Sequence, residues 1–262
     1  MTIKIKQNNK YSKLVNFKNN HEEPIHRWFK IKEGYSKELI IGLIDEFSIS
    51  NGYIVDFFNG SGTTVLTAKE KGLRYYGFEI NPFLHLLSQI KLSDFSKEDI
   101  VKIIKTKKYI LSSYKKINKA EQINLSILEK VFGKNLEDLL KIRTKILNIK
   151  EPLIRDFFIV ALVSIIDDIG YAKKDGNGLK YPKTKKIREV VGMFSEKIEN
   201  MLEDINLSKI KPARSSQIIL GDSRNIPSTL LNKIKNKTKM VVFSPPYANC
   251  FDYSEVYKLE LW

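Results

Sequence analysis

An apolar run at residues 240–243 leads directly into Ser244-Pro245-Pro246-Tyr247. Two consecutive prolines fix the backbone and remove two N–H donors. Their carbonyls and the Ser244 hydroxyl then form a rigid edge of hydrogen-bond acceptors, with the flat ring of Tyr247 beside it. Such an edge is suited to holding an aromatic amine. An ordinary turn at a strand end has the same residues, because Pro-Pro is common in loops, so this motif alone leaves both interpretations open.

A second candidate motif spans residues 53–64, where an apolar run breaks at Gly60-Ser61-Gly62 and a helical pattern follows from Thr63. A strand, a glycine turn and a helix N-terminus leave backbone N–H groups where a ligand can approach closely. The next apolar run ends at Glu79. Its spacing from Gly60 is close to the roughly 20 residues typical of a carboxylate that binds ribose hydroxyls.

The residues after the glycine turn indicate the class of cofactor. A phosphate-binding loop for nucleoside triphosphates needs Gly-Lys-Ser/Thr, and this chain has Gly62-Thr63-Thr64. The dinucleotide motif needs a third small residue where this chain has Val65. A nucleoside without a diphosphate therefore fits better.

Taken together, three segments resemble the S-adenosylmethionine-dependent DNA amino-methyltransferases: residues 56–64, residues 77–83 and residues 244–247, in this order. The stretch from His26 to Ser36 resembles the segment that helps to hold the methionine end of the cofactor in members with this motif order. The recognisable regions are residues 21–92 and 215–262.

The resemblance implies S-adenosylmethionine as the cofactor. Gly60 and Gly62 would contact it through their backbone, Asp56 would bind its amino-acid end and Glu79 its ribose hydroxyls. Asp222 would contact the adenine, although an Asp at such a place can equally cap a strand-to-helix turn. The complete set of cofactor-binding candidates is Tyr35, Ser36, Asp56, Phe58, Gly60, Gly62, Thr63, Glu79, Asn81 and Asp222.

The same resemblance makes Ser244, Pro245, Pro246 and Tyr247 the catalytic candidates. Ser244 and the Pro245 carbonyl would accept hydrogen bonds from the target amine, and Tyr247 would stack on a base flipped out of the duplex. A sulfonium is an activated methyl donor, so alignment and a polarised nucleophile suffice and no metal site is expected. Carbon-5 methylation of cytosine does not fit, because it typically uses a Pro-Cys pair and Cys250, the only cysteine, follows Asn249. We expect methylation of an exocyclic amine, with cytosine N4 slightly favoured over adenine N6.

The charge of the chain agrees with a DNA partner. Lys and Arg number 45 against 30 Asp and Glu, which gives a net charge of +15. An AT-rich genome also enriches lysine, but here the positive charge concentrates in residues 97–150 and 171–190, outside the expected cofactor-binding strands. The second stretch has the composition of a loop that contacts phosphate, and its alternative is a mobile, solvated lysine loop. The DNA-contact candidates are Tyr171, Lys173, Lys174, Lys180 and Lys183.

We expect an α/β fold with a large helical insertion, and the resemblance implies that its sheet is a Rossmann-like class I methyltransferase sheet. Strands are expected near residues 53–58, 75–80, 217–221 and 240–244, and helical spacing of apolar residues dominates in between. The apolar segment 157–163 predicts a buried helix that ties the insertion to the sheet. The predicted organisation is a basic tail at 1–20, a discontinuous cofactor-binding and catalytic domain at 21–92 and 211–262, and a helical insertion at 93–210.

A methyltransferase sheet should continue after its fourth strand, so we expect this chain to be incomplete at its C-terminal side. Three functions remain open: a site-specific DNA methyltransferase of a restriction-modification system, a non-catalytic or split half-enzyme that needs a second polypeptide, and an RNA or protein amine methyltransferase. Residues 1–10 lack the apolar core of a signal peptide, and no apolar run is long enough to span a membrane. With a single cysteine, these features predict a cytoplasmic protein without membrane partners.

Overall fold

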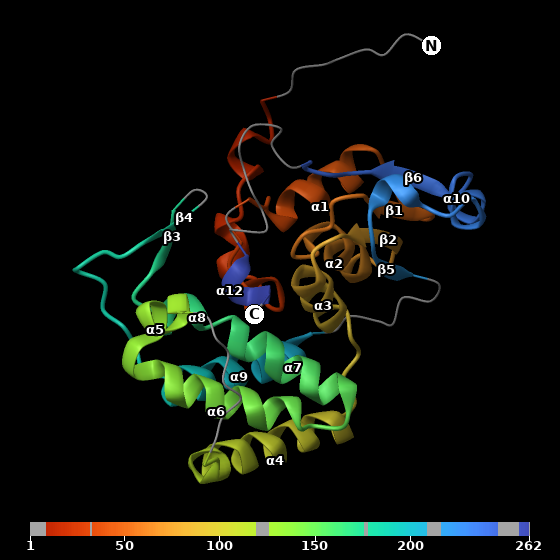
Figure 1. Ribbon diagram of the computed structural model, residues 1–262. Helices are drawn as coiled ribbons and strands as arrows, with labels where there is room; N and C mark the ends of the chain where they lie inside the picture. Colours follow the sequence, from red (N-terminus) through yellow and green to blue (C-terminus); the bar gives the residue numbers. More distant parts are fainter. Residues whose placement is uncertain are drawn as a thin grey trace. The chain divides into compact units, whose positions relative to one another are not determined.

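The computed structural model describes residues 9–31, 33–118, 126–175, 178–208, 216–245 and 257–261 (Figure 1). The chain forms two compact units. The first contains residues 1–92 and 209–245, and the second contains residues 93–208 and 246–262. The sequence prediction kept everything after residue 210 with the first unit, whereas the structure groups the described residues 257–261 with the second.

A four-stranded parallel sheet organises the first unit, in the order β5-β2-β1-β6. The strands are β1 (Tyr53–Asp56), β2 (Arg74–Glu79), β5 (Gln217–Leu220) and β6 (Thr238–Val241). The two central strands come from the first stretch of the chain and the two outer strands from the second. This arrangement confirms the predicted α/β class with a Rossmann-like sheet.

Helices bury both faces of this sheet, as a parallel sheet requires. They are α1 (Lys37–Glu46), α2 (Thr63–Glu70), α3 (Pro82–Lys91) and α10 (Ser228–Ile234). Successive residues of β1 point to opposite faces: Ile54 packs in a cluster with residues of α1 and α2, whereas Tyr53 and Val55 pack in a cluster with Ile234 of α10. All four residues of β1 are buried, which explains why a run of Tyr53, Ile54 and Val55 precedes Asp56 without an exposed polar position.

The first described residues, 9–28, form short helices that pack within the first unit. Short 3-10 helices occupy Ser12–Leu14, Lys18–His21 and His26–Trp28. Phe17 and Asn20 are buried, and the Tyr11 hydroxyl donates to the Gly42 carbonyl at 3.1 Å. Residues 9–20 therefore pack against the first unit, although the sequence prediction assigned them to a basic tail.

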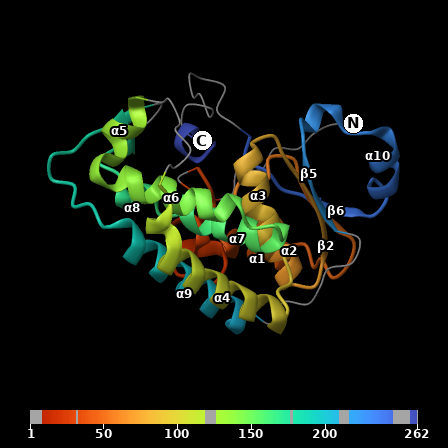
Figure 2. The same cartoon turned by 60° about the horizontal axis from the view of Figure 1, so that its bottom comes forward.

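The second unit is helical. Its helices are α4 (Lys97–Ser113), α5 (Ser126–Phe132), α6 (Leu136–Leu147), α7 (Pro152–Val163), α8 (Ile166–Ile169), α9 (Val190–Leu207) and α12 (Lys258–Leu261), with 3-10 turns at Tyr114–Lys116 and Gly133–Asn135. The apolar helix α7 packs against α4, α6 and α9, and Figure 2 shows these four helices side by side. Phe157 and Phe158 of α7 are fully buried. Within the described residues, none of the helices has both the length and the apolarity to cross a membrane.

The lysine-rich stretch that the sequence predicted as a loop contains an antiparallel hairpin. Its strands are β3 (Lys173–Asp175) and β4 (Gly178–Lys180). Two residues, Gly-Asn, separate the strands, and this dipeptide is a turn signal for hairpins. The strands are only three residues each, so the alternation of apolar and polar residues that marks a strand could not be recognised.

Candidate active site

Four polar positions follow the carboxyl ends of the four parallel strands. Asp56 and Glu79 are the last residues of β1 and β2, Asp222 follows β5 and Ser244 follows β6. Because carboxyl ends of parallel strands meet at one edge of a sheet, the fold gathers these residues at the edge where open α/β sheets bind ligands. The sequence prediction had assigned Asp56, Glu79 and Asp222 to the cofactor and Ser244 to the target amine.

Asp56 is fully buried and accepts three hydrogen bonds. Its Oδ2 accepts from the Tyr35 hydroxyl at 2.9 Å and from the Thr64 hydroxyl at 2.7 Å, and its Oδ1 accepts from the Phe58 N–H at 2.9 Å. Burial raises the pKa of Asp56 to about 6, although the three donors favour the ionised form. A buried carboxylate in this state is stabilised further by any positive charge that binds beside it.

The glycine turn between β1 and α2 requires its two glycines. Gly60 has φ = 52° and Gly62 has φ = 84°, in the left-handed region that residues with side chains rarely adopt. A Cβ added to Gly62 would also lie 2.9 Å from Oγ of Ser88. Close packing of the turn on α3 therefore adds to the conformational requirement.

Glu79 is buried and fastens this turn to the end of β2. Its Oε2 accepts from the Gly60 N–H at 2.6 Å, and its Oε1 accepts from the Asn81 N–H at 2.8 Å. Burial raises the pKa of Glu79, and these two N–H donors oppose the shift. The Asn81 side chain caps α3 by accepting from the N–H groups of Phe83 and Leu84, at 2.9 and 3.1 Å.

Two other predicted cofactor residues have local partners. The Asp222 carboxylate accepts from the Arg224 N–H at 2.9 Å and caps the 3-10 helix Ser223–Asn225. Hydrogen bonds from the Arg224 guanidinium, which lies 2.6 Å from Oδ2, lower the pKa of Asp222 to about 2. The Ser36 hydroxyl donates to the Leu14 carbonyl at 3.2 Å. Asp222 thus has the capping role that the sequence left as an alternative.

The segment after β6 runs beside the end of β1. The Val242 N–H donates to the Val55 carbonyl at 3.0 Å, and the Phe243 ring lies 5.7 Å from that of Phe58. Ser244 and Pro245 follow and are exposed. Pro246, Tyr247 and Cys250 lie outside the described residues.

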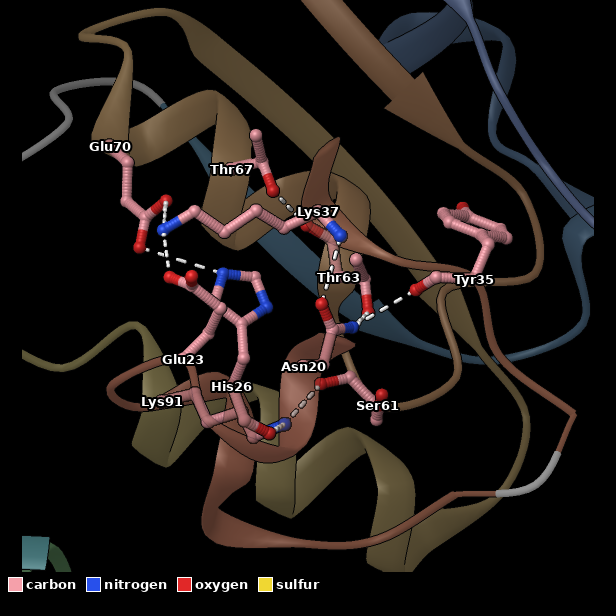
Figure 3. Close-up of polar contacts among 10 residues, drawn as sticks. All are labelled: Asn20, Glu23, His26, Tyr35, Lys37, Ser61, Thr63, Thr67, Glu70 and Lys91. Carbon is pink, nitrogen blue, oxygen red and sulfur yellow. Dashed lines mark hydrogen bonds and ion pairs between the residues drawn. The ribbon is translucent and has the colours of Figure 1, made fainter. Parts of the chain in front are cut away.

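Several residues that organise this site have no sequence motif. Figure 3 shows Asn20, whose Nδ2 donates to the Tyr35 carbonyl at 3.0 Å and whose Oδ1 accepts from the Lys37 N–H at 2.9 Å. Nothing marks this asparagine in a basic stretch of sequence. Gly77, by contrast, begins the recognised segment 77–83, and a glycine inside a strand indicates close approach of another group. A Cβ there would lie 2.7 Å from Oδ1 of Asn59.

The second unit holds the predicted DNA-contact residues around its hairpin. Lys173 lies opposite Lys180, and both are exposed, as is Lys183. The exposed Tyr171 ring packs on Gly133, where an added Cβ would lie 2.7 Å from it. Lys174 pairs with Leu179 through the backbone register.

The chain is similar to known DNA methyltransferases. The model of the N6/N4 methyltransferase family, described as DNA methylase, matches residues 3–89. The type II methyltransferase M.BsoBI of Geobacillus stearothermophilus is 32% identical over 279 residues, which cover 95% of this chain and 54% of that protein. M.AvaI of Nostoc sp., also named a type II methyltransferase, is 25% identical over 95% of this chain and 56% of its own length. This chain spans about half the length of these two relatives.

Proposed function

We propose that the chain belongs to the N6/N4 DNA methylase family, whose model matches residues 3–89, and that it transfers a methyl group from S-adenosylmethionine to an exocyclic amino group of a DNA base. The observation that best supports this proposal is the arrangement of Asp56, the glycine turn and Glu79 at the sheet edge where Ser244 also lies. The relatives' names support a role in a type II modification system.

The chemistry of the donors fits this cofactor. S-adenosylmethionine, when bound, supplies a methyl group already activated by its sulfonium. Asp56 is a buried carboxylate with a raised pKa, so the ammonium of the cofactor's amino-acid end would favour its ionised form. The two oxygens of Glu79 each accept one N–H and have lone pairs left for ribose hydroxyls. In this proposal Tyr35, Phe58 and Thr63 line the same site, and Asp222 lies on the adenine side.

Ser244 and Pro245 would hold the target amine. Two acceptors facing an amino group withdraw its lone pair from conjugation and direct it toward the methyl donor. Phe243 supports this placement, because its ring packs against Phe57 and Phe58 at the end of β1 and so positions the next residue beside the cofactor strand. Tyr247 would stack on the flipped base. We favour cytosine N4 over adenine N6 as the acceptor.

The hairpin around β3 and β4 would contact the DNA backbone. Lys173, Lys180 and Lys183 are exposed, and their side chains would contact DNA phosphates. Tyr171 is exposed beside them, and Lys174 belongs to the same strand. These contacts position the protein on DNA and do not by themselves read sequence.

The experiment that tests the proposed function has two readouts. Isothermal titration calorimetry measures binding of S-adenosylmethionine, and mass spectrometry of digested DNA measures N4-methylcytosine and N6-methyladenine after incubation with the cofactor. We expect binding and one methylated nucleoside, which identifies the base. Binding without either nucleoside would contradict methyl transfer to DNA by this chain, and labelling of RNA or of a protein amide instead would identify another acceptor.

A further inference from the structure

Lys91, the last residue of α3, has a buried side chain that reaches the glycine turn. Only 3% of the residue is exposed, and its Nζ donates to the Ser61 carbonyl at 3.0 Å and to the His26 carbonyl at 3.2 Å (Figure 3). A buried ammonium is unfavourable unless hydrogen bonds replace its water. Here these bonds join the central residue of the glycine turn to a segment far from it in sequence.

Each of the three carbonyls of the glycine turn accepts a hydrogen bond from a group within the protein. Ser88, one helical turn before Lys91 on α3, donates its hydroxyl to the Gly60 carbonyl at 3.0 Å. Lys91 holds the Ser61 carbonyl, and the Gly62 carbonyl accepts from the Leu66 N–H at 2.9 Å within the start of α2. In a trans peptide the N–H points opposite to the carbonyl. Fixing the Gly60 carbonyl on α3 therefore turns the Ser61 N–H away from α3, and no backbone carbonyl among the described residues accepts from that N–H.

The other carbonyl that Lys91 holds belongs to the segment that carries Tyr35. Ile25, just before His26, has φ = 64°, a conformation that costs a β-branched residue free energy and needs surrounding contacts to persist. The His26 ring is fully buried, with Nε2 3.5 Å from Oε1 of Glu70 on α2. Lys37 also binds Glu70, at 3.2 Å. These contacts fasten the segment along α2, so that Tyr35 reaches Asp56.

We propose that Lys91 is a positioning residue for cofactor binding: its ammonium fixes the glycine turn through Ser61 and fastens the Tyr35 segment to that turn through His26. This inference rests on the proposed cofactor site. Because Lys91 holds both the turn and the segment, its loss should disturb the turn and the Tyr35–Asp56 contact together. If Lys91 only filled space, its replacement would lower overall stability without a particular effect on the turn or on the Tyr35–Asp56 contact.

The chain offers a matched control in Lys69. This lysine is also 3% exposed, and its Nζ donates to the Leu92 carbonyl at 2.5 Å, near the opposite end of α2 from the glycine turn. Lys91→Met and Lys69→Met each remove a buried ammonium. Lys91→Arg retains a charged donor and tests whether that donor restores cofactor binding.

We would measure the dissociation constant for S-adenosylmethionine by calorimetry, with thermal unfolding as the check on folding. We expect Lys91→Met to weaken binding at least tenfold, Lys69→Met to change it less than twofold at a similar loss of thermal stability, and Lys91→Arg to restore part of the affinity. Equal effects of the two methionine variants would overturn the proposal.

Amide hydrogen exchange without any ligand separates this inference from the proposed function. We expect Lys91→Met, and not Lys69→Met, to increase exchange in peptides that cover residues 57–64. If the wild type fails to bind S-adenosylmethionine, the proposed function fails, while the exchange result still decides whether Lys91 positions the turn. Unchanged exchange in Lys91→Met would overturn the inference even if the wild type binds the cofactor.

Discussion

The hydroxyl of Tyr35 donates a 2.9 Å hydrogen bond to Oδ2 of the buried Asp56, and the Thr64 hydroxyl donates to the same oxygen. Tyr35 comes from the N-terminal segment, and Asp56 ends a central strand of the sheet. The contact brings an aromatic donor into the candidate active site, and burial raises the pKa of Tyr35 well above its usual range, so the phenol stays protonated as a donor.

Removing the Tyr35 hydroxyl should weaken cofactor binding. A hydrogen bond to a charged group contributes about 1.5 to 3 kcal/mol, so we expect Tyr35→Phe to raise the dissociation constant for S-adenosylmethionine by about tenfold or more at pH 7. Calorimetry measures this change. Tyr11→Phe is the control, because Tyr11 donates to the carboxylate of Glu46 at 2.6 Å and neither residue belongs to the candidate site. A similar loss in both variants would contradict a specific role for Tyr35.

Asp56 should make the folded state less stable as pH rises. Its folded-state pKa of about 6 lies above the ordinary value of 3.8, so the folded chain binds the extra proton between these values. The stabilisation is complete below pH 3.8 and is lost as pH rises through about 6. At about 1.4 kcal/mol per pKa unit, the loss is about 3 kcal/mol.

The comparison with Asp56→Asn isolates this contribution from other titrating groups. Chemical unfolding of both proteins between pH 4 and pH 8 should show the variant gaining stability relative to the wild type as pH rises. A difference that is independent of pH would show that Asp56 titrates near its ordinary pKa.

Gly62 should tolerate alanine less well than Gly72. Both have left-handed backbones, with φ = 84° and 71°, but an added Cβ at Gly72 meets nothing within 4 Å. We expect Gly72→Ala to cost about 1 kcal/mol from backbone strain alone. Gly62→Ala should cost more because of the contact with Ser88, and urea unfolding measures both. Equal losses would mean that Ser88 moves aside without cost.

Replacing Ser244 should slow methyl transfer without changing the affinity for the cofactor. Ser244 follows β6 and is exposed, so Ser244→Ala leaves the core unchanged. We expect turnover to fall by about tenfold to a hundredfold, with the dissociation constant for S-adenosylmethionine unchanged within experimental error. Unchanged turnover would remove Ser244 from the catalytic residues, and lost cofactor binding would move it to the cofactor site.

The hairpin lysines should change the salt dependence of DNA binding. Each phosphate contact contributes about 0.9 to the slope of log affinity against log salt concentration, so Lys173→Ser and Lys180→Ser should each reduce that slope by about this amount. Lys102→Ser is the control, because Lys102 belongs to α4 and not to the hairpin, and it pairs with Glu151 at 2.9 Å. Fluorescence anisotropy with a short duplex at several salt concentrations gives the slopes. Slopes equal to that of the wild type would show that the hairpin does not contact phosphate.

The sequence predicted the parts of the fold and site that depend on local pattern. The four strands lie where apolar runs predicted them, and Glu79 reaches Gly60 because parallel strands gather their carboxyl ends at one edge. The roles of Asn20 and Lys91 were not predictable, since a buried polar side chain is recognised by its partners and these lie in distant segments. The hairpin was missed because its strands are short and rich in lysine.

The parts of the chain that supply the four strands also determine the order in which the sheet can form. Strands β1 and β2 pair from the first stretch of the chain, but residues 93–208 of the helical unit separate them in sequence from their outer neighbours β6 and β5. During synthesis the central pair emerges with two unpaired edges, which are sites of aggregation. Helices α4 to α9 of the helical unit are synthesised before β5 and β6, so we expect these helices to pack first, while the cofactor edge is completed only after β6 has been synthesised.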